Sequence, residues 1–108
     1  MQYNCCTNGK LPDMSQFQYL EIAAVYPYPN GEDGTSCEAF PGVASGLIPL
    51  EDFLSPEEDK SMLFYTVYGR DSEGYAEALH DECSLEVVKN IAGKITSQHK
   101  HLQPVVIL

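Results

Sequence analysis

The chain is poor in basic residues and lacks the long apolar stretches that cross a membrane. The 108 residues include six lysines and arginines but sixteen aspartates and glutamates, which gives a formal net charge of −10. A surface this negative repels phosphate backbones and anionic lipids. No apolar run approaches the roughly 18 residues of a membrane helix, and the start has no basic and apolar signal segment. We therefore predict a cytoplasmic protein that binds neither nucleic acid nor a membrane directly.

Sequence motifs for metals, nucleotides and catalysis are also missing. The eight glycines are scattered among predicted turns, so they do not form a phosphate-binding loop. The cysteines lack the paired C-x₂-C spacing of structural zinc sites and the regular spacing of a disulfide framework. We predict no cofactor, no metal and no catalytic residue, and we interpret the cysteines as thiols. They are Cys5, Cys6, Cys37 and Cys83.

A small thiol- or zinc-dependent enzyme stays open as an alternative. His80 lies three residues before Cys83, and Cys37 with Cys5 or Cys6 would complete four zinc ligands. His80 could also serve as the base for a cysteine nucleophile. The acidic surroundings argue against this chemistry, because nearby negative charge raises the pKa of a thiol.

Apolar and aromatic residues are abundant enough for a folded core. They make up 44% of the chain, including seven tyrosines and four phenylalanines, which a disordered acidic tail would lack. The length suits one domain, and no internal linker or repeat divides the chain. We therefore predict a single globular domain over residues 1–108.

Period-two patterns and β-branched residues predict most of the strands. We expect a strong strand at 19–26, ended by Pro27 and Pro29, and a brief one at 36–40. Residues 62–68 and 75–80 read as an antiparallel hairpin, with Leu79 and His80 on opposite faces. A short strand at 2–7 before the Asn8-Gly9 turn and an edge strand at 105–108 complete the set.

Two helices are predicted. Ser84 caps a main helix of about residues 84–100, whose apolar stripe must pack on a sheet. Ser55, Pro56 and Glu58 resemble a capping box and predict a short helix near 56–61. The fold class is therefore α+β: a small antiparallel sheet with the main helix packed on one face. The apolar stripe consists of Leu85, Val88, Ile91, Ala92 and Ile95.

The acidic residues are unevenly distributed. All of them lie at or before Glu86, and residues 51–86 hold eleven acids against two bases. Charges of opposite sign attract, so the negative charge of this segment indicates a basic protein partner, most simply one that binds nucleic acid.

In size, acidity and lack of catalytic motifs the chain is similar to the small inhibitors that phages and mobile elements carry, such as anti-CRISPR and anti-restriction proteins. This resemblance implies an inhibitor that mimics DNA and occupies the nucleic-acid-binding surface of its target. A self-associating or structural interaction module is the alternative, with the loop 41–49 and the strand 105–108 as its contact surfaces. The predicted partner-binding residues are Glu51, Asp52, Glu57, Glu58, Asp59, Asp71, Glu73, Asp81 and Glu82.

Overall fold

The structure is a computed structural model that describes residues 10–29 and 34–108. The predicted strand at 2–7 and the Asn8-Gly9 turn lie outside these residues. In chain order the elements are η2 (Met14–Gln16), β1 (Phe17–Pro29), β2 (Thr35–Phe40), η4 (Leu50–Asp52), η5 (Lys60–Met62), β3 (Phe64–Asp71), β4 (Ala76–Glu82), α1 (Leu85–Gln98) and β5 (Val106–Ile107).

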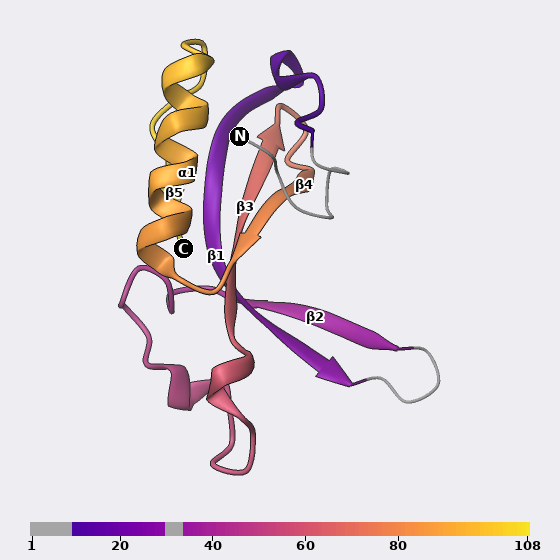
Figure 1. Cartoon of the computed structure of the whole chain (residues 1–108), viewed down its shortest axis with the longest axis vertical. Helices are drawn as coiled ribbons and strands as arrows, with labels where there is room; N and C mark the ends of the chain where they lie inside the picture. Colours follow the sequence, from indigo (N-terminus) through magenta and orange to yellow (C-terminus); the bar gives the residue numbers. More distant parts are fainter. Residues whose placement is uncertain (1–9, 30–33) are drawn as a thin grey trace.

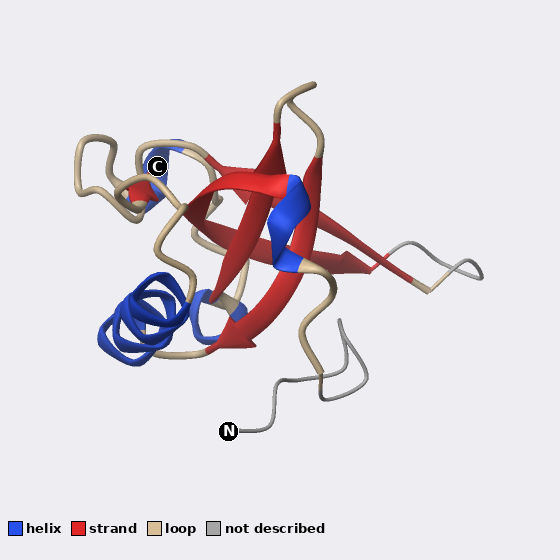
Figure 2. Cartoon of the chain, turned by 90° about the horizontal axis from the view of Figure 1, so that it is seen from above, coloured by secondary structure: helices blue, strands red, loops and turns tan. Residues whose placement is uncertain are grey.

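The strands form one sheet in the order β2-β1-β3-β4, with antiparallel neighbours throughout this path. The short β5 pairs with β1 in parallel. Helix α1 packs against one face of the sheet (Figure 1), and the view from above shows the two layers side by side (Figure 2). These features confirm the predicted α+β class. No helix in the described part of the chain is long and apolar enough to span a membrane.

Strand β1 is longer than predicted, because Pro27 and Pro29 do not end it. Beyond Val25, which lies opposite Phe64, β1 has lost its neighbour β3 and pairs with β2 alone. Alternate residues of a strand direct their N–H groups to opposite neighbours. The Ile22 carbonyl accepts a hydrogen bond from the N–H of Leu108, so the backbone polar groups of Ile22 point to the β5 side. Pro27 and Pro29 follow Ile22 by an odd number of residues, so their nitrogen atoms point to the opposite side, which β3 has left. Their missing N–H groups therefore cost no ladder hydrogen bond.

Helix α1 confirms the main helix prediction within two residues at its C-terminal end. The Ser84 hydroxyl caps it by accepting a hydrogen bond from the backbone N–H of Val87 at 3.3 Å. The stripe residues Val88, Ile91, Ala92 and Ile95 are buried. They form the main core with residues of the sheet, which include Leu20, Ile22, Ala24, Val67 and Leu79.

The short helix predicted at 56–61 is wrong. Glu58 does accept a hydrogen bond from the backbone N–H of Ser55 at 3.0 Å, as a capping box would. However, Asp59 is extended (φ −79°, ψ 105°) and caps a separate 3₁₀ turn, η5. Three residues between two caps leave no room for a helical turn, whose nucleation is costly without further propagation.

The face assignment within the predicted hairpin is also wrong at one point. The β3–β4 register shifts after Val67, which lies opposite His80, while Tyr68 lies opposite Ala78. Leu79 is the extra residue of this bulge. Leu79 and His80 are consequently both buried, with Leu79 in the core beneath α1.

The terminal strand is shorter than predicted, and it is tied into the molecule. Ile107 packs against the main core, and the N–H of Leu108 donates to the carbonyl of Ile22 at 2.9 Å. The carbonyl of Leu108 accepts from the N–H of Ser45 at 2.9 Å. This part of the expected self-association surface is therefore used inside the fold.

A second, smaller core holds the segment between β2 and β3 in place. Tyr26, Phe40 and Leu54 are its buried residues, and Phe53 stacks on Phe40 with ring centroids 4.6 Å apart. The segment 41–63 lies at the end of the molecule away from the β3–β4 turn (Figure 1). This packing fixes the position of the most acidic loop in the chain.

Candidate acidic protein-binding site

Five of the nine predicted residues gather in one loop, residues 50–62, which we call the acidic lobe. Lys60 is the only base among these thirteen residues. The lobe comprises η4, η5 and the turn between them. Its acids are Glu51, Asp52, Glu57, Glu58 and Asp59.

Strand β1 anchors the acidic lobe directly. The Tyr26 hydroxyl donates a 2.9 Å hydrogen bond to the backbone carbonyl of Asp59. Leu54 is buried against Tyr26 and Phe40, so the smaller core holds the start of the turn between η4 and η5 in place. The carboxylates therefore sit on a fixed scaffold, which limits the entropy lost when a partner binds.

Two of the lobe carboxylates shape the loop itself. Asp59 accepts hydrogen bonds from the Ser61 hydroxyl at 2.6 Å and from its N–H at 2.9 Å, and these bonds lower the pKa of Asp59. Glu58 accepts from the N–H and the hydroxyl of Ser55. Changing either residue would disturb the loop as well as its charge.

The other three lobe acids are exposed to solvent. Glu51 contacts Lys60 at 3.2 Å, and its pKa is lowered by its own backbone N–H and then by Lys60. The carboxylates of Asp52 and Glu57 make no hydrogen bond or ion pair with another described residue. These two are the carboxylates best suited to contact a partner, because no internal bond has to break.

Tyr28 extends the acidic surface towards β2. Partial burial raises the pKa of Tyr28, and the carboxylates of Glu58 and Glu38 raise it further. The tyrosine and both acids therefore lie close enough to interact. Glu38, on β2, is an acid of this surface that the sequence did not single out.

Asp71 and Glu73, two of the nine predicted residues, lie away from this surface. Both lie at the β3–β4 turn, near the opposite end of the longest axis of the molecule (Figure 1). Asp71 accepts hydrogen bonds from the N–H groups of Glu73 and Tyr75. Its carboxylate therefore stabilises the turn.

Asp81 and Glu82 end β4 and lie between the two groups. Asp81 accepts a 2.7 Å hydrogen bond from the Thr66 hydroxyl. Glu82 contacts the imidazole of the buried His80 at 2.7 Å. Both acids line a pocket together with Ser61 and Met62, so they adjoin the acidic lobe.

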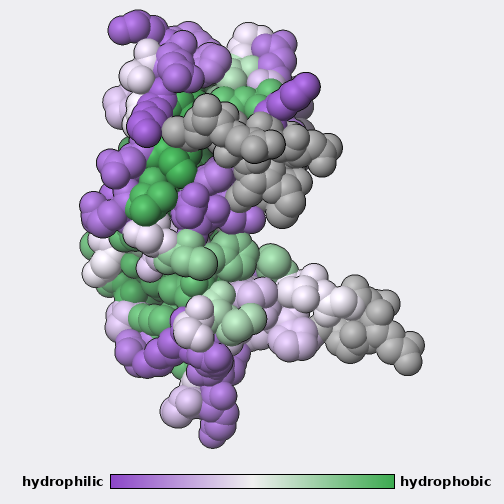
Figure 3. Space-filling model, viewed as in Figure 1, coloured by the Kyte–Doolittle hydropathy of each residue, from purple (hydrophilic) through white to green (hydrophobic). Residues whose placement is uncertain are grey.

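Exposed apolar side chains lie within the acidic lobe and just before it in the chain. Leu47 is 83% exposed, Met62 is 51% exposed and Ile48 is 36% exposed. Figure 3 shows hydrophilic residues gathered at this end of the visible face, below a band of hydrophobic ones. Exposed apolar side chains near charged ones are typical of protein contact surfaces.

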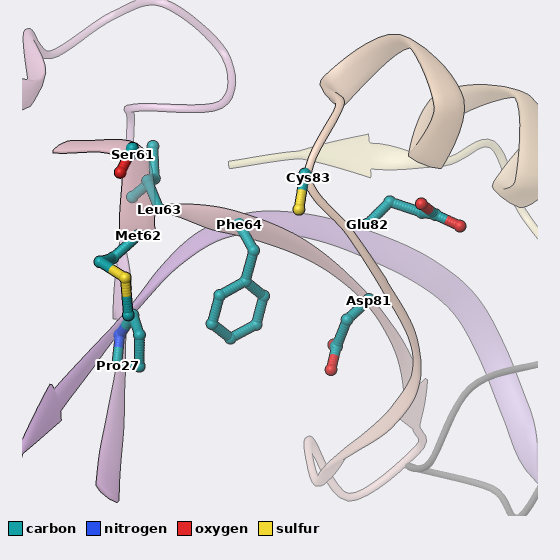
Figure 4. A pocket seen from close by; sticks show the side chains of 8 residues that line it. All are labelled: Pro27, Ser61, Met62, Leu63, Phe64, Asp81, Glu82 and Cys83. Carbon is teal, nitrogen blue, oxygen red and sulfur yellow. The ribbon is translucent and has the colours of Figure 1, made fainter.

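The pocket next to the lobe has a volume of about 470 Å³. Its apolar walls come from β1, η5 and the start of β3, and its polar side comes from the end of β4 (Figure 4). No local pattern in the sequence could reveal it, because its first and last lining residues, Pro27 and Cys83, are more than fifty residues apart. The lining residues are Pro27, Ser61, Met62, Leu63, Phe64, Asp81, Glu82 and Cys83.

The thiol and imidazole groups of the alternative enzyme hypothesis are dispersed. Cys37 and Cys83 are both exposed, one on β2 and the other after β4. Among residues 10–29 and 34–108, no three His, Cys, Asp or Glu side chains are grouped as metal ligands. Cys5 and Cys6 lie outside the described residues. The geometry therefore gives this hypothesis no further support.

The chain matches no protein-family model, and it shows no significant similarity to a curated protein or a solved structure. Inference about its function therefore depends on its own residues.

Proposed function

We propose that this protein is a small acidic inhibitor that binds a basic, nucleic-acid-binding protein through the acidic lobe. The observation that carries the proposal is the gathering of five carboxylates with one lysine on a loop fixed by a separate aromatic core. Such a one-sign surface attracts a basic partner over distances set by the ionic strength. Asp71 and Glu73 are left out of the proposed contact.

Carboxylates can replace phosphates in a basic groove. Arginine and lysine form short, charge-assisted hydrogen bonds with either group. The fixed lobe would thus occupy side chains that otherwise hold nucleic acid, and the partner could not bind both at once.

The apolar residues beside the lobe support protein rather than ion binding. Opposite charges mainly set the association rate and the choice of partner, whereas buried apolar contacts supply much of the affinity. Leu47 and Met62 are exposed and therefore available for such contacts.

Charge reversal at two exposed lobe residues tests the proposal. The tagged protein is used to capture partners from host lysate, in parallel with a variant carrying Asp52→Lys and Glu57→Lys. We expect the variant to lose a nucleic-acid-binding protein that the wild type retains, with affinity reduced at least about tenfold. Because neither side chain bonds to another described residue, the variant should fold, with a melting temperature no lower than that of the wild type.

A matched control reverses two charges at the other end of the molecule. Glu73→Lys with Glu77→Lys changes the net charge equally, and both residues are exposed. This control should retain the partner, and wild type should displace nucleic acid from the purified partner. Equal loss of binding in both double variants, or a partner that still holds its nucleic acid, would contradict the proposal.

Self-association is the outcome that would favour the alternative module. The exposed Leu47 and Ile48 would then contact a second copy of the chain. A sizing column would show a species well above 12.0 kDa, and Leu47→Ser would return it to a monomer.

A further inference from the structure

We propose that the pocket beside the acidic lobe receives an arginine side chain of the partner. This inference rests on the proposed function, because the same basic partner supplies the arginine. It concerns the open pocket of about 470 Å³ that is lined by Pro27 of β1, by η5, by the start of β3 and by the end of β4.

The walls of the pocket suit the aliphatic part of a long side chain. Pro27, Met62 and Phe64 lie around the hollow, and the Phe64 ring stands between Met62 and Asp81 (Figure 4). Burying the methylene groups of a basic side chain against such a surface is favourable while its charged end stays near the rim.

The charges around the pocket select a cation. Two of the lining residues, Asp81 and Glu82, are acids and none is basic. Figure 4 shows the Asp81 side chain beside Phe64, while Glu82 is turned away from the ring. The acidic lobe adds further negative charge next to Ser61, so a neutral or anionic group is disfavoured at this position.

Asp81 is held in place for this contact by Thr66. The 2.7 Å hydrogen bond from the Thr66 hydroxyl fixes the carboxylate at the edge of the sheet. A carboxylate has about four lone-pair sites, so one that already has partners can accept further donors. Fixing the acceptor in advance lowers the entropic cost of binding.

The combination of a ring and a carboxylate favours arginine over lysine. A guanidinium is planar, so it can lie against the Phe64 ring and at the same time donate to a carboxylate in its own plane. A lysine ammonium is compact and strongly hydrated, and it gains less from the ring.

The test uses three synthetic peptides that differ in one side-chain type. Each repeats Gly-X-Gly three times, and X is arginine, lysine or citrulline, which has the shape of arginine without its charge. Binding is measured by NMR titration of the whole protein. We expect the arginine peptide to bind more tightly than the lysine peptide, with citrulline weakest, and to shift the amides of Phe64 and Cys83.

Two single variants of β4 distinguish binding in the pocket from attraction by the overall negative charge of the protein. Asp81→Asn should weaken the arginine peptide about fivefold or more, because a charged hydrogen bond is lost. Glu77→Gln removes one exposed negative charge from the same strand, away from the pocket, and should change the affinity less than about twofold. Phe64→Leu, with its fold checked by NMR, should erase the preference for arginine over lysine.

Equal effects of Asp81→Asn and Glu77→Gln would overturn the pocket assignment and leave the proposed function intact. Equal binding of the arginine and lysine peptides would overturn the choice of arginine. Failure of the proposed function looks different: the Asp52→Lys and Glu57→Lys variant would then bind its partner as wild type does.

Discussion

At the scale of single residues, the most informative contact is the ion pair between Glu21 and Arg70. The Arg70 guanidinium contacts one oxygen of Glu21 through Nε at 2.8 Å and Nη2 at 2.7 Å, and it donates to the Gly74 carbonyl at 2.8 Å. The Glu21 side chain is only 7% exposed. Glu21 is also the one charged residue in the apolar strand predicted at 19–26, and its partner lies 49 residues away.

Removing one member of this pair should destabilise the protein more than removing both. Arg70→Met leaves the Glu21 carboxylate buried without its partner, and we expect a loss of about 3 kcal/mol in unfolding free energy. Glu21→Met with Arg70→Met removes both charges and should recover much of that loss. Urea unfolding of the wild type, both single variants and the double variant measures the coupling. Additive losses would show that the two residues act independently.

Gly69 is a second residue whose role depends on a distant neighbour. The strand predicted at 62–68 ends just before it, whereas the structure places it inside β3. A Cβ atom there would lie 2.8 Å from three ring atoms of the buried Phe17. The glycine is therefore required by close packing between β3 and the start of β1.

At the scale of elements, helix and turn signals differed in how well they predicted structure. Helix α1 has a cap, a long apolar stripe and a sheet to pack on, so local and tertiary preferences agree. The hydrogen bond from Ser55 to Glu58 that the capping box predicts does form, but no helix follows it. Asp59 begins a new turn four residues after Ser55. A cap therefore predicts a helix only when a periodic apolar segment follows it.

Helix α1 contains one residue that weakens it. Gly93 is exposed, and an added Cβ would have no atom within 4 Å outside its own helix. We expect Gly93→Ala to stabilise the protein by about 1 kcal/mol, since alanine loses less backbone entropy in a helix. For a domain of this size the melting temperature should rise by about 4 to 8 °C. Calorimetry measures the melting temperature. An unchanged or lower melting temperature would contradict this prediction and show that alanine is not favoured over glycine at position 93.

At the scale of the whole molecule, charge and core are separated. The main core lies under α1, the smaller core lies under the acidic lobe, and the lobe sits near one end of the long axis (Figure 1). Carboxylates crowded at one end repel one another, because Lys60 is the only cation within the lobe. The acidic surface thus opposes the stability that the smaller core provides.

Salt should therefore stabilise this protein against unfolding. Raising the ionic strength from about 10 to 150 mM shortens the screening length from about 30 to 8 Å and weakens repulsion within the lobe. We expect the urea midpoint of the wild type to rise over this range. It should rise less in the variant with Asp52→Lys and Glu57→Lys, whose lobe repulsion is reduced. A midpoint that falls with salt would show that attractive pairs dominate instead.

Most elements of the fold could be predicted from local patterns, but the candidate site could be predicted only in part. The acids of the lobe lie close together in the sequence, so their grouping could be predicted. The separation of Asp71 and Glu73 from them could not be predicted, because it depends on the direction in which β3 leaves the lobe. The pocket was missed for the same reason, since Pro27 and Cys83 meet only after the sheet has formed.

The sequence by itself determined the net charge, the α+β class, the main helix and the hairpin, because these depend on composition and on periodicities within about fifteen residues. The tertiary structure decided which strands stay paired through Pro27 and Pro29, which residue forms the bulge at Leu79, and where the acidic lobe is anchored. Those features depend on register between segments far apart in the chain, and register is set by the packing of a common core.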